Sequence, residues 1–289
     1  MPAATVIVPT HTHDLLLPPA VRSALRQTVQ DVEVMIVGDG MTDATRAAAR
    51  QLAADDPRVR VFDNPKAGRT GEPHRREAIA ESTAPAILYL CDDDLWLPEH
   101  VEHVLGLLDG HDVANALSVW IGPTGIVQHT TLDLALPFHR AEVCAHRQTP
   151  SLTAMAHTRD WYERLPHGWR LTPDGIGTDS WMWRQLLEDP ACRARSGFIP
   201  TIVHLPSPQR REMTPEQRLD ELARYEQLVV DPAWRRGFVE RTLAGALQEC
   251  AWFWASRAEL QASWDEQNAM LRHVWEDRAR VYAELGKSG

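Results

Sequence analysis

The sequence contains very little lysine and no long apolar run. Only two of its 30 basic residues are lysines, and 40 acidic residues give a formal net charge of −10. Such a surface repels polyphosphate backbones, so we expect no nucleic acid bound across a broad face, although a basic pocket for one phosphorylated small molecule stays open. Since no apolar run approaches the ~18–20 residues that cross a bilayer, we predict no membrane span.

Cysteine pairs are missing as well. The four cysteines stand far apart, with no C-x-x-C pair, at positions 91, 144, 192 and 250. This spacing indicates neither a disulfide framework nor a cysteine zinc site, and it predicts a protein of the reducing cytoplasm. The remaining composition, with 44% hydrophobic and 24% charged residues in a chain of 289, is typical of a globular protein with one large core and a smaller appendage.

Strand and helix patterns alternate over the first hundred residues. Short apolar runs at 4–9, 32–37, 59–62 and 86–90 indicate strands, and segments with helical spacing lie between them. This alternation predicts an α/β fold, in which a mostly parallel sheet has helices on both faces. Short strands, loops and one helix near 179–188 follow.

The last part of the chain has helical patterns alone. Thr214-Pro215-Glu216-Gln217 is a helix start with a capping box, and apolar residues then recur at helical spacing. We therefore predict two regions, an α/β domain at 1–208 and a helical C-terminal region at 209–289.

Three consecutive carboxylates follow the apolar strand at 86–90. Asp92, Asp93 and Asp94 would repel one another unless something positive lies among them. They stand at the carboxyl edge of the predicted sheet, where open α/β sheets bind ligands. Carboxylate oxygens suit Mg²⁺ or Mn²⁺, and these ions bridge phosphate oxygens. The alternative is a solvated acidic loop in which one aspartate caps the next helix.

A second polar turn follows the strand at 32–37. Gly38 and Gly40 invite comparison with a dinucleotide-binding motif, but Asp43 occupies the third glycine position, so that interpretation fails. Asp39 suits a hydrogen bond to a base or ribose. A simple capping turn is the alternative.

Together these motifs resemble the family 2 glycosyltransferases, which have the GT-A fold. The resemblance runs from Val6 to about Leu205, and its segments are VIVPT, VEVMIVGDGMTD and ILYLCDDDLWLPEH, the last similar to the family's DxD loop. It implies a metal-dependent, inverting transfer of sugar from a nucleoside-diphosphate sugar, most often a UDP sugar, to an acceptor hydroxyl. The divalent metal would be Mn²⁺ or Mg²⁺.

The resemblance also assigns donor-site roles. Pro9 and Thr10 would lie beside the base, and Asp39 would contact the base or ribose. The other donor contacts would be Arg69, Arg75, Asp92 and Asp93. Gly38 stands where the family often has an aspartate, which leaves the base open.

The metal ligands follow from the same resemblance. Asp92 and Asp94 would hold the ion, with Asp94 as the direct ligand, and His204 would be a third ligand. A structural histidine is the alternative for His204.

A general base is expected further along the chain. Asp179, which opens a helix in Gly177-Thr178-Asp179-Ser180, matches the family's catalytic aspartate. A positioned carboxylate that takes the acceptor proton contributes typically ~10²–10⁴-fold to the rate. The alternative is a helix N-cap.

Three further residues are candidate contacts of acceptor or phosphate. Trp181 would stack against a sugar or an aromatic acceptor. Arg210 and Arg211, in a proline-bearing loop, present guanidinium donors that suit phosphate oxygens, although a solvated loop explains them equally well. The helical region at 209–289 would cover the acceptor cleft or form a homodimer interface.

Two other functions stay open. A nucleotidyltransferase of related fold usually has a glycine-rich loop with a basic residue after its first strand, and Thr10-His11-Thr12-His13-Asp14 lacks both features. A non-catalytic binding protein of the same fold would not need Asp39, the Asp92–Asp94 run and Asp179 together. The acceptor is not identified by the sequence.

Overall fold

The computed structural model describes residues 1–125 and 127–248, together with 251, 262, 265 and 269. The chain divides into two units, Met1–Leu243 and Ala244–Gly289. The boundary predicted after residue 208 therefore falls inside the first unit. The region predicted to form a homodimer interface, 209–289, is described as far as residue 248, and most of its remainder lies outside the described residues. Among the described helices, none combines the length and the apolar character that a membrane span requires.

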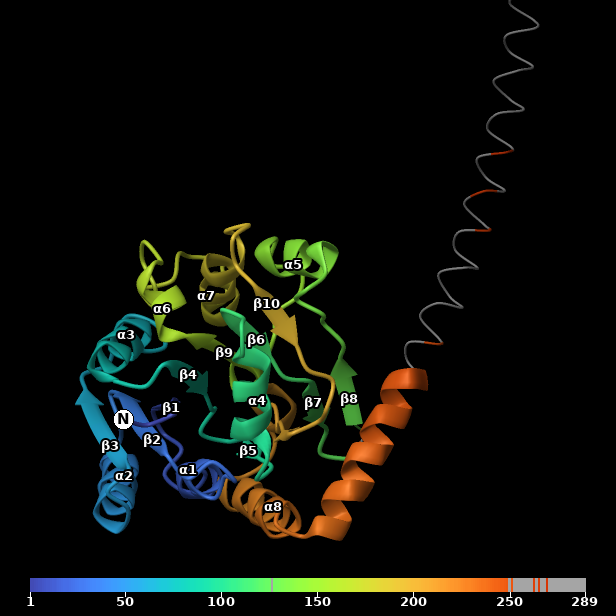
Figure 1. Cartoon of the computed structure of the whole chain (residues 1–289). Coiled ribbons are helices and arrows are strands. Elements are labelled where there is room, and N and C mark those ends of the chain that lie inside the picture. Colours follow the sequence, from blue (N-terminus) through green and yellow to red (C-terminus); the bar gives the residue numbers. More distant parts are fainter. Residues whose placement is uncertain (126, 249–250, 252–261, 263–264, 266–268, 270–289) are drawn as a thin grey trace, which may run out of the picture. The chain divides into compact units, whose positions relative to one another are not determined.

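The first unit alternates strands and helices (Figure 1). The strands are β1 Ala4–Thr10, β2 Val32–Asp39, β3 Val59–Asn64, β4 Ala86–Tyr89, β5 Leu95–Trp96, β6 Val113–Asn115, β7 Ser118–Ile121, β8 Val127–Thr130, β9 Met155–Thr158, β10 Ala194–Ser196 and β11 Ile202–Val203. The α-helices are α1 Leu17–Leu25, α2 Asp43–Asp55, α3 Glu72–Glu81, α4 His100–Leu108, α5 Pro137–Cys144, α6 Arg159–Glu163, α7 Thr178–Leu187 and α8 Pro215–Leu228.

Seven strands form the central sheet in the order β10-β6-β9-β4-β1-β2-β3. Strand β1 lies between β4 and β2 and pairs in parallel with both, with Val6 opposite both Val34 and Leu88. Strand β9 runs antiparallel to β4 and β6. The predicted mostly parallel α/β sheet is confirmed, but β6, β9 and β10 are strands that the sequence patterns did not indicate.

Helices cover both faces of the sheet. Side chains of a strand point alternately to its two faces, so neighbouring residues of one strand pack against different helices. Val6 and Val8 of β1 pack with residues of α1, α2 and α4. Ile7, between them, packs on the opposite face with residues of α3, α6 and α7. Figure 1 shows the same division, with the sheet between the two groups of helices.

The carboxyl ends of three neighbouring strands meet at one edge of the sheet. Strand β1 ends at Thr10 and β2 at Asp39, while β4 is followed by the turn that carries Asp92–Asp94. The two-stranded pair of β5 and β11 places His204 near this edge. Helix α8 packs on α1 and β5, and its Leu222 is buried among apolar residues that include Leu95 and Leu205.

Candidate functional site

A cavity of about 820 Å³ opens at this edge of the sheet. Nine residues that the sequence predicted for the site line it: Pro9, Thr10, Asp39, Arg69, Arg75, Asp92, Asp93, Asp179 and His204. Four others are not among its lining residues: Asp94, Trp181, Arg210 and Arg211. The geometry therefore brings together most of the predicted site from segments that are far apart in the sequence.

The three consecutive aspartates have different surroundings. Asp92 accepts hydrogen bonds from the Thr10 hydroxyl, at 2.6 Å, and from His13 Nδ1, at 2.9 Å. This bond to Asp92 raises the pKa of His13, although burial opposes the shift. Asp92 thus joins the end of β1 to the acidic turn.

Asp94 is not among the residues that line the cavity and is fully buried. Its Oδ1 accepts a bond from the Leu205 backbone N–H at 2.9 Å, and its Oδ2 accepts bonds from Thr153 Oγ1 and His204 Nδ1 at 2.5 and 2.6 Å. Burial alone would raise the pKa of Asp94, but the His204 charge and these hydrogen bonds outweigh it and lower the pKa. Both oxygens of Asp94 therefore accept hydrogen bonds from protein donors, and its role as the direct metal ligand stays a prediction.

Asp93 is the carboxylate of this turn that faces the cavity with an unshared oxygen. Its Oδ2 accepts bonds from Ser207 Oγ at 2.5 Å and Arg218 Nη2 at 2.7 Å. Its Oδ1 has no hydrogen-bond donor within the described part of the chain. Burial, together with the charges of Asp94 and Asp92, raises the pKa of Asp93 to about 6.

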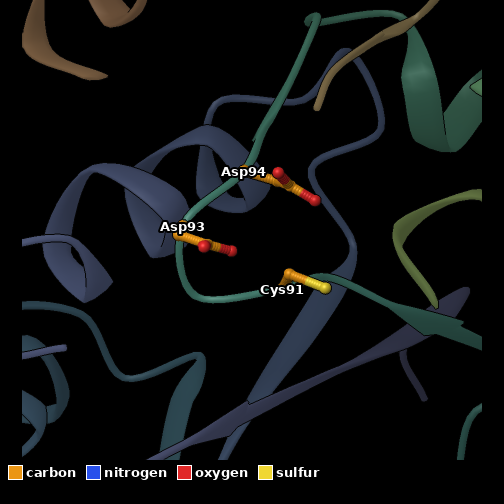
Figure 2. A group of neighbouring side chains, drawn as sticks. All are labelled: Cys91, Asp93 and Asp94. Carbon is orange, nitrogen blue, oxygen red and sulfur yellow. The ribbon is translucent and has the colours of Figure 1, made fainter. Parts of the chain in front are cut away.

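Potential metal-ligating atoms gather around this turn. One atom each of Cys91, Asp93 and Asp94 lies within 4.8 Å of the others (Figure 2). Burial and the charges of the two aspartates raise the pKa of the Cys91 thiol well above its usual value, and a protonated thiol is a poor ligand.

Asp93 and His204 line the same cavity and are further candidate ligands of a divalent cation. His204 Nδ1 bonds to Asp94, and no described residue bonds to its Nε2, as in sites where a carboxylate orients a metal-binding histidine. The Asp94 charge raises the pKa of His204 in spite of burial, so a metal ion would have to displace a proton from this ring in order to bind. Asp93 Oδ1 and His204 Nε2 would then leave most positions of a Mn²⁺ or Mg²⁺ ion to phosphate oxygens and water.

Asp39 is held by a lysine that the sequence interpretation overlooked. Lys66 Nζ lies 2.5 Å from Asp39 Oδ2, and the Ala67 backbone N–H donates to Oδ1 at 2.6 Å. Gly71, with φ of +77°, passes so close that a Cβ there would lie 2.8 Å from Asp39 Cβ. The rarity of lysine and its place just after β3 are the signals that would have identified Lys66.

The two predicted arginines differ in what they contact. Arg69 donates to the backbone carbonyls of Thr172, Pro173 and Ile176, at 2.8–3.0 Å, and so secures the loop before α7. Arg75 is 5% exposed and lies over the Trp169 ring at 4.6 Å. Its Nε and Nη1 are buried and lack a partner among the described residues, so Arg75 keeps donors for a ligand.

Asp179 lies in the first turn of α7 and lines the same cavity. No described residue donates a hydrogen bond to its carboxylate, and Thr178, the first residue of α7, bonds to Glu72 Oε1 at 3.3 Å. Burial raises the pKa of Asp179, against the opposing charge of Arg75. A partly exposed carboxylate with a raised pKa and no partner is suited to accept a proton from a substrate.

Glu72 anchors this helix start and was not predicted. It is fully buried and accepts hydrogen bonds from the Thr70 backbone, the Thr172 hydroxyl and Thr178. Burial would raise the pKa of Glu72, but backbone and hydroxyl donors outweigh it and lower the pKa.

The predicted phosphate contacts on the proline-bearing loop line a second cavity of about 510 Å³. Arg210 is buried and forms a two-point ion pair with Glu221, at 2.5 and 2.8 Å, so its charge is already compensated. Arg211 is exposed, without an ion pair to the described residues. Trp181 packs against Arg170, at 5.6 Å from the ring centre.

In sequence, the chain is similar to known glycosyltransferases. A family model described as "Glycosyl transferase family 2" matches residues 5–188. GalNAc(5)-diNAcBac-PP-undecaprenol beta-1,3-glucosyltransferase of Campylobacter jejuni is 31% identical over 96 residues, which cover 32% of this chain and 30% of the relative. An uncharacterized glycosyltransferase of Nostoc is 26% identical over 184 residues, 59% of this chain and 56% of the relative. The chain thus spans 30% to 56% of the length of these curated relatives.

Solved structures give the fold. S. aureus TarS 1-349 in complex with UDP-GlcNAc matches with a TM-score of 0.59 and 14% identity, covering 84% of this chain and 72% of that chain. Mannosyltransferase PcManGT from Pyrobaculum calidifontis, in complex with GDP-Man and Mn²⁺, matches with a TM-score of 0.51 and 18% identity, covering 90% and 80%. At these identities the likeness shows the fold alone, which is of the predicted GT-A type.

Proposed function

Because the chain belongs to glycosyl transferase family 2, we propose that it transfers a sugar from a nucleoside-diphosphate sugar to an acceptor hydroxyl. The observation that carries the proposal is the position of Asp179. Its unpartnered carboxylate, with a raised pKa, lines the same cavity as Asp39 and Asp93. A base, a nucleotide-binding carboxylate and a carboxylate for the diphosphate end are the groups that this transfer needs.

The chemistry is a direct displacement at the anomeric carbon. The acceptor oxygen attacks this carbon, Asp179 takes the hydroxyl proton, and the bond to the nucleoside diphosphate breaks. One base and no second nucleophilic carboxylate give inversion of the anomeric configuration. Proton removal by a positioned carboxylate contributes typically ~10²–10⁴-fold.

The donor would lie with its nucleoside near Thr10 and Asp39 and its diphosphate near Asp93. Asp93 and His204 would hold a Mn²⁺ or Mg²⁺ ion, with Asp94 orienting His204. When bound, such an ion neutralises charge that develops on the leaving diphosphate. Arg75, with two unpartnered donors beside Asp179, would bind oxygens of the donor.

A UDP sugar is our preferred donor. TarS is described in complex with UDP-GlcNAc and with UDP, which supports this preference, whereas PcManGT is described with GDP-Man. The acceptor is a hydroxyl compound that the cavity does not identify.

A nucleotide-release assay tests the proposal. The protein is incubated with Mn²⁺ and a panel of UDP, GDP and dTDP sugars, with water as a slow substitute for the acceptor, and the released nucleoside diphosphate is measured. We expect release from a UDP sugar by the wild type and by Asp174→Asn, an exposed control on the neighbouring loop, but not by Asp179→Asn. Absence of release from all three classes of donor contradicts the proposal.

A further inference from the structure

Helix α8 contributes an arginine to the acidic turn. Arg218 Nη2 donates to Asp93 Oδ2 at 2.7 Å and to Ser207 Oγ at 2.8 Å, and Nη1 lies 3.4 Å from His13 Nε2. The side chains of Arg218 and Asp93 are only 14% and 11% exposed. This ion pair is therefore largely shielded from water and is stronger than a surface pair.

The ion pair uses the carboxylate that a divalent cation would need. Among the three aspartates, Asp92 and Asp94 have both oxygens bonded to protein donors, whereas Asp93 has donors on Oδ2 alone. A guanidinium on Asp93 neutralises its charge and repels a second cation nearby. Arg218 and a divalent ion therefore compete for the single negative charge of Asp93.

The second cavity offers the arginine another position. Arg218 lines this cavity of about 510 Å³, which shares Thr12, His13, Ser207 and Pro208 with the larger one. Arg218 thus lines the second cavity while its guanidinium contacts Asp93 of the larger one, and its buried Nε has no partner among the described residues.

We propose that Arg218 is a built-in cation that competes with a divalent metal ion for Asp93. When the ion binds Asp93, the guanidinium leaves that carboxylate toward the second cavity. The inference rests on the proposed function in placing the ion at the donor site, but the competition itself requires no donor. It predicts that the side chain of Arg218 sets the metal affinity of the protein.

Mn²⁺ binding without nucleotide is the test. The electron paramagnetic resonance signal of free Mn²⁺ gives the dissociation constant for the wild type and Arg218→Met. Arg22→Met is the matched control, because Arg22 forms a two-point ion pair with Glu226 of the same helix and lines neither cavity. Arg218→Gln keeps hydrogen-bonding groups without the charge and serves where Arg218→Met does not fold. An Asp93→Asn background shows whether the effect acts through this carboxylate.

We expect Mn²⁺ affinity to rise about tenfold in Arg218→Met and Arg218→Gln, as removal of a nearby like charge predicts. Arg22→Met should bind as the wild type does, and the effect should vanish in the Asp93→Asn background. Unchanged or weaker Mn²⁺ binding in folded Arg218 variants overturns the inference, as does an equal gain in Arg22→Met. If the Arg218 variants fail this test while the wild type releases nucleotide, the competition is refuted and the proposed function stands. If the Arg218 variants bind Mn²⁺ more tightly but the wild type releases no nucleotide, the competition stands and the proposed function is refuted.

Discussion

At the scale of single residues, Asp179 combines the position proposed for the general base with a cost in stability. Burial raises the pKa of Asp179 in the folded protein, so its ionised form is less stable in the folded protein than in the unfolded one. That cost is present at pH values above the folded pKa and disappears as the pH falls below the unfolded value. A residue retained at such a cost is typical of a catalytic site.

Asp179→Asn should therefore separate activity from stability. Without the base, turnover is expected to fall by about 10²–10⁴-fold, while the affinity for nucleoside diphosphate stays the same. The melting temperature should be equal or higher, because the variant removes the ionised group. Steady-state kinetics, calorimetric titration and thermal melts measure the three quantities. Turnover at the wild-type level in Asp179→Asn contradicts the assignment of the base.

The pH dependence of turnover follows from the same shift. The base works only when ionised, so the rate should fall as the pH decreases through the pKa of Asp179, at a higher pH than for an ordinary aspartate. Rates measured at saturating donor and Mn²⁺ should show this acid limb in the wild type. The residual rate of Asp179→Asn should lack it, and an identical limb in that variant would assign the titration to another group.

That Asp92 and Asp93 line the cavity while Asp94 does not could not be predicted from the sequence. Consecutive residues in a turn have no fixed direction, and Asp94 is drawn inward by Thr153, His204 and Leu205, which come from distant segments. The positions of Asp39 and Asp179 were predictable, because each stands at an element end that an apolar or capping pattern marks.

At the scale of elements, the start of α7 is positioned by the start of α3. Buried Glu72 connects Thr70 to Thr172 and Thr178, next to the catalytic candidate. Its lowered pKa means that ionised Glu72 stabilises the fold at pH values above its unfolded pKa. This contribution is lost as the pH falls through the folded pKa.

Glu72→Gln should reduce both stability and turnover. Loss of the charged acceptor for buried donors lowers the free energy of unfolding by roughly 1–3 kcal/mol. The start of α7 would shift without this anchor, and Asp179 would move with it. The loss of melting temperature should be clear at pH 7 and should shrink as the solution is acidified. Glu77→Gln, whose side chain is 68% exposed, is the control and should melt like the wild type. Equal melting temperatures for both variants at pH 7 would contradict this role.

The strands at 4–10, 32–39, 59–64 and 86–89 were predictable because each has a short apolar run after a helix or loop signal. Strand β9 was not, because its sequence MAHT has no such run and follows a 3₁₀ turn. It is stabilised by long-range pairing with β4 and β6. Local patterns therefore identify the parallel strands β1 to β4 and miss β9, which joins them to β6 and β10.

At the scale of the whole molecule, helix α8 belongs to the unit that contains the sheet. Leu222 is 1% exposed, Glu226 pairs with Arg22 and Arg26, and Arg218 reaches the acidic turn. The helical patterns after residue 208 are present in the sequence, but their packing on α1 and β5 is a property of the folded chain.

A chain ended after residue 208 should therefore not melt cooperatively, whereas one ended after residue 243 should do so. The shorter chain exposes the apolar partners of Leu222. In the full chain, Leu222→Ala alone should cost roughly 2–5 kcal/mol of unfolding free energy, and Val230→Ala, at an exposed position, should cost little. Differential scanning calorimetry of the two shortened chains and the two substituted chains measures these effects. A shorter chain with the melting temperature of the longer one would support the boundary after residue 208 instead.

The central claim is that the cavity binds a nucleoside diphosphate through a cation held by Asp93. Isothermal titration of UDP, with Mn²⁺ and with EDTA, into the wild type, Asp93→Asn and the exposed control Asp109→Asn tests it most directly. We predict binding in Mn²⁺ by the wild type and Asp109→Asn, and affinity at least about tenfold lower in Asp93→Asn, because the cation loses its carboxylate. Equal UDP affinity in Asp93→Asn, or no binding of UDP, GDP or dTDP by the wild type, would contradict it.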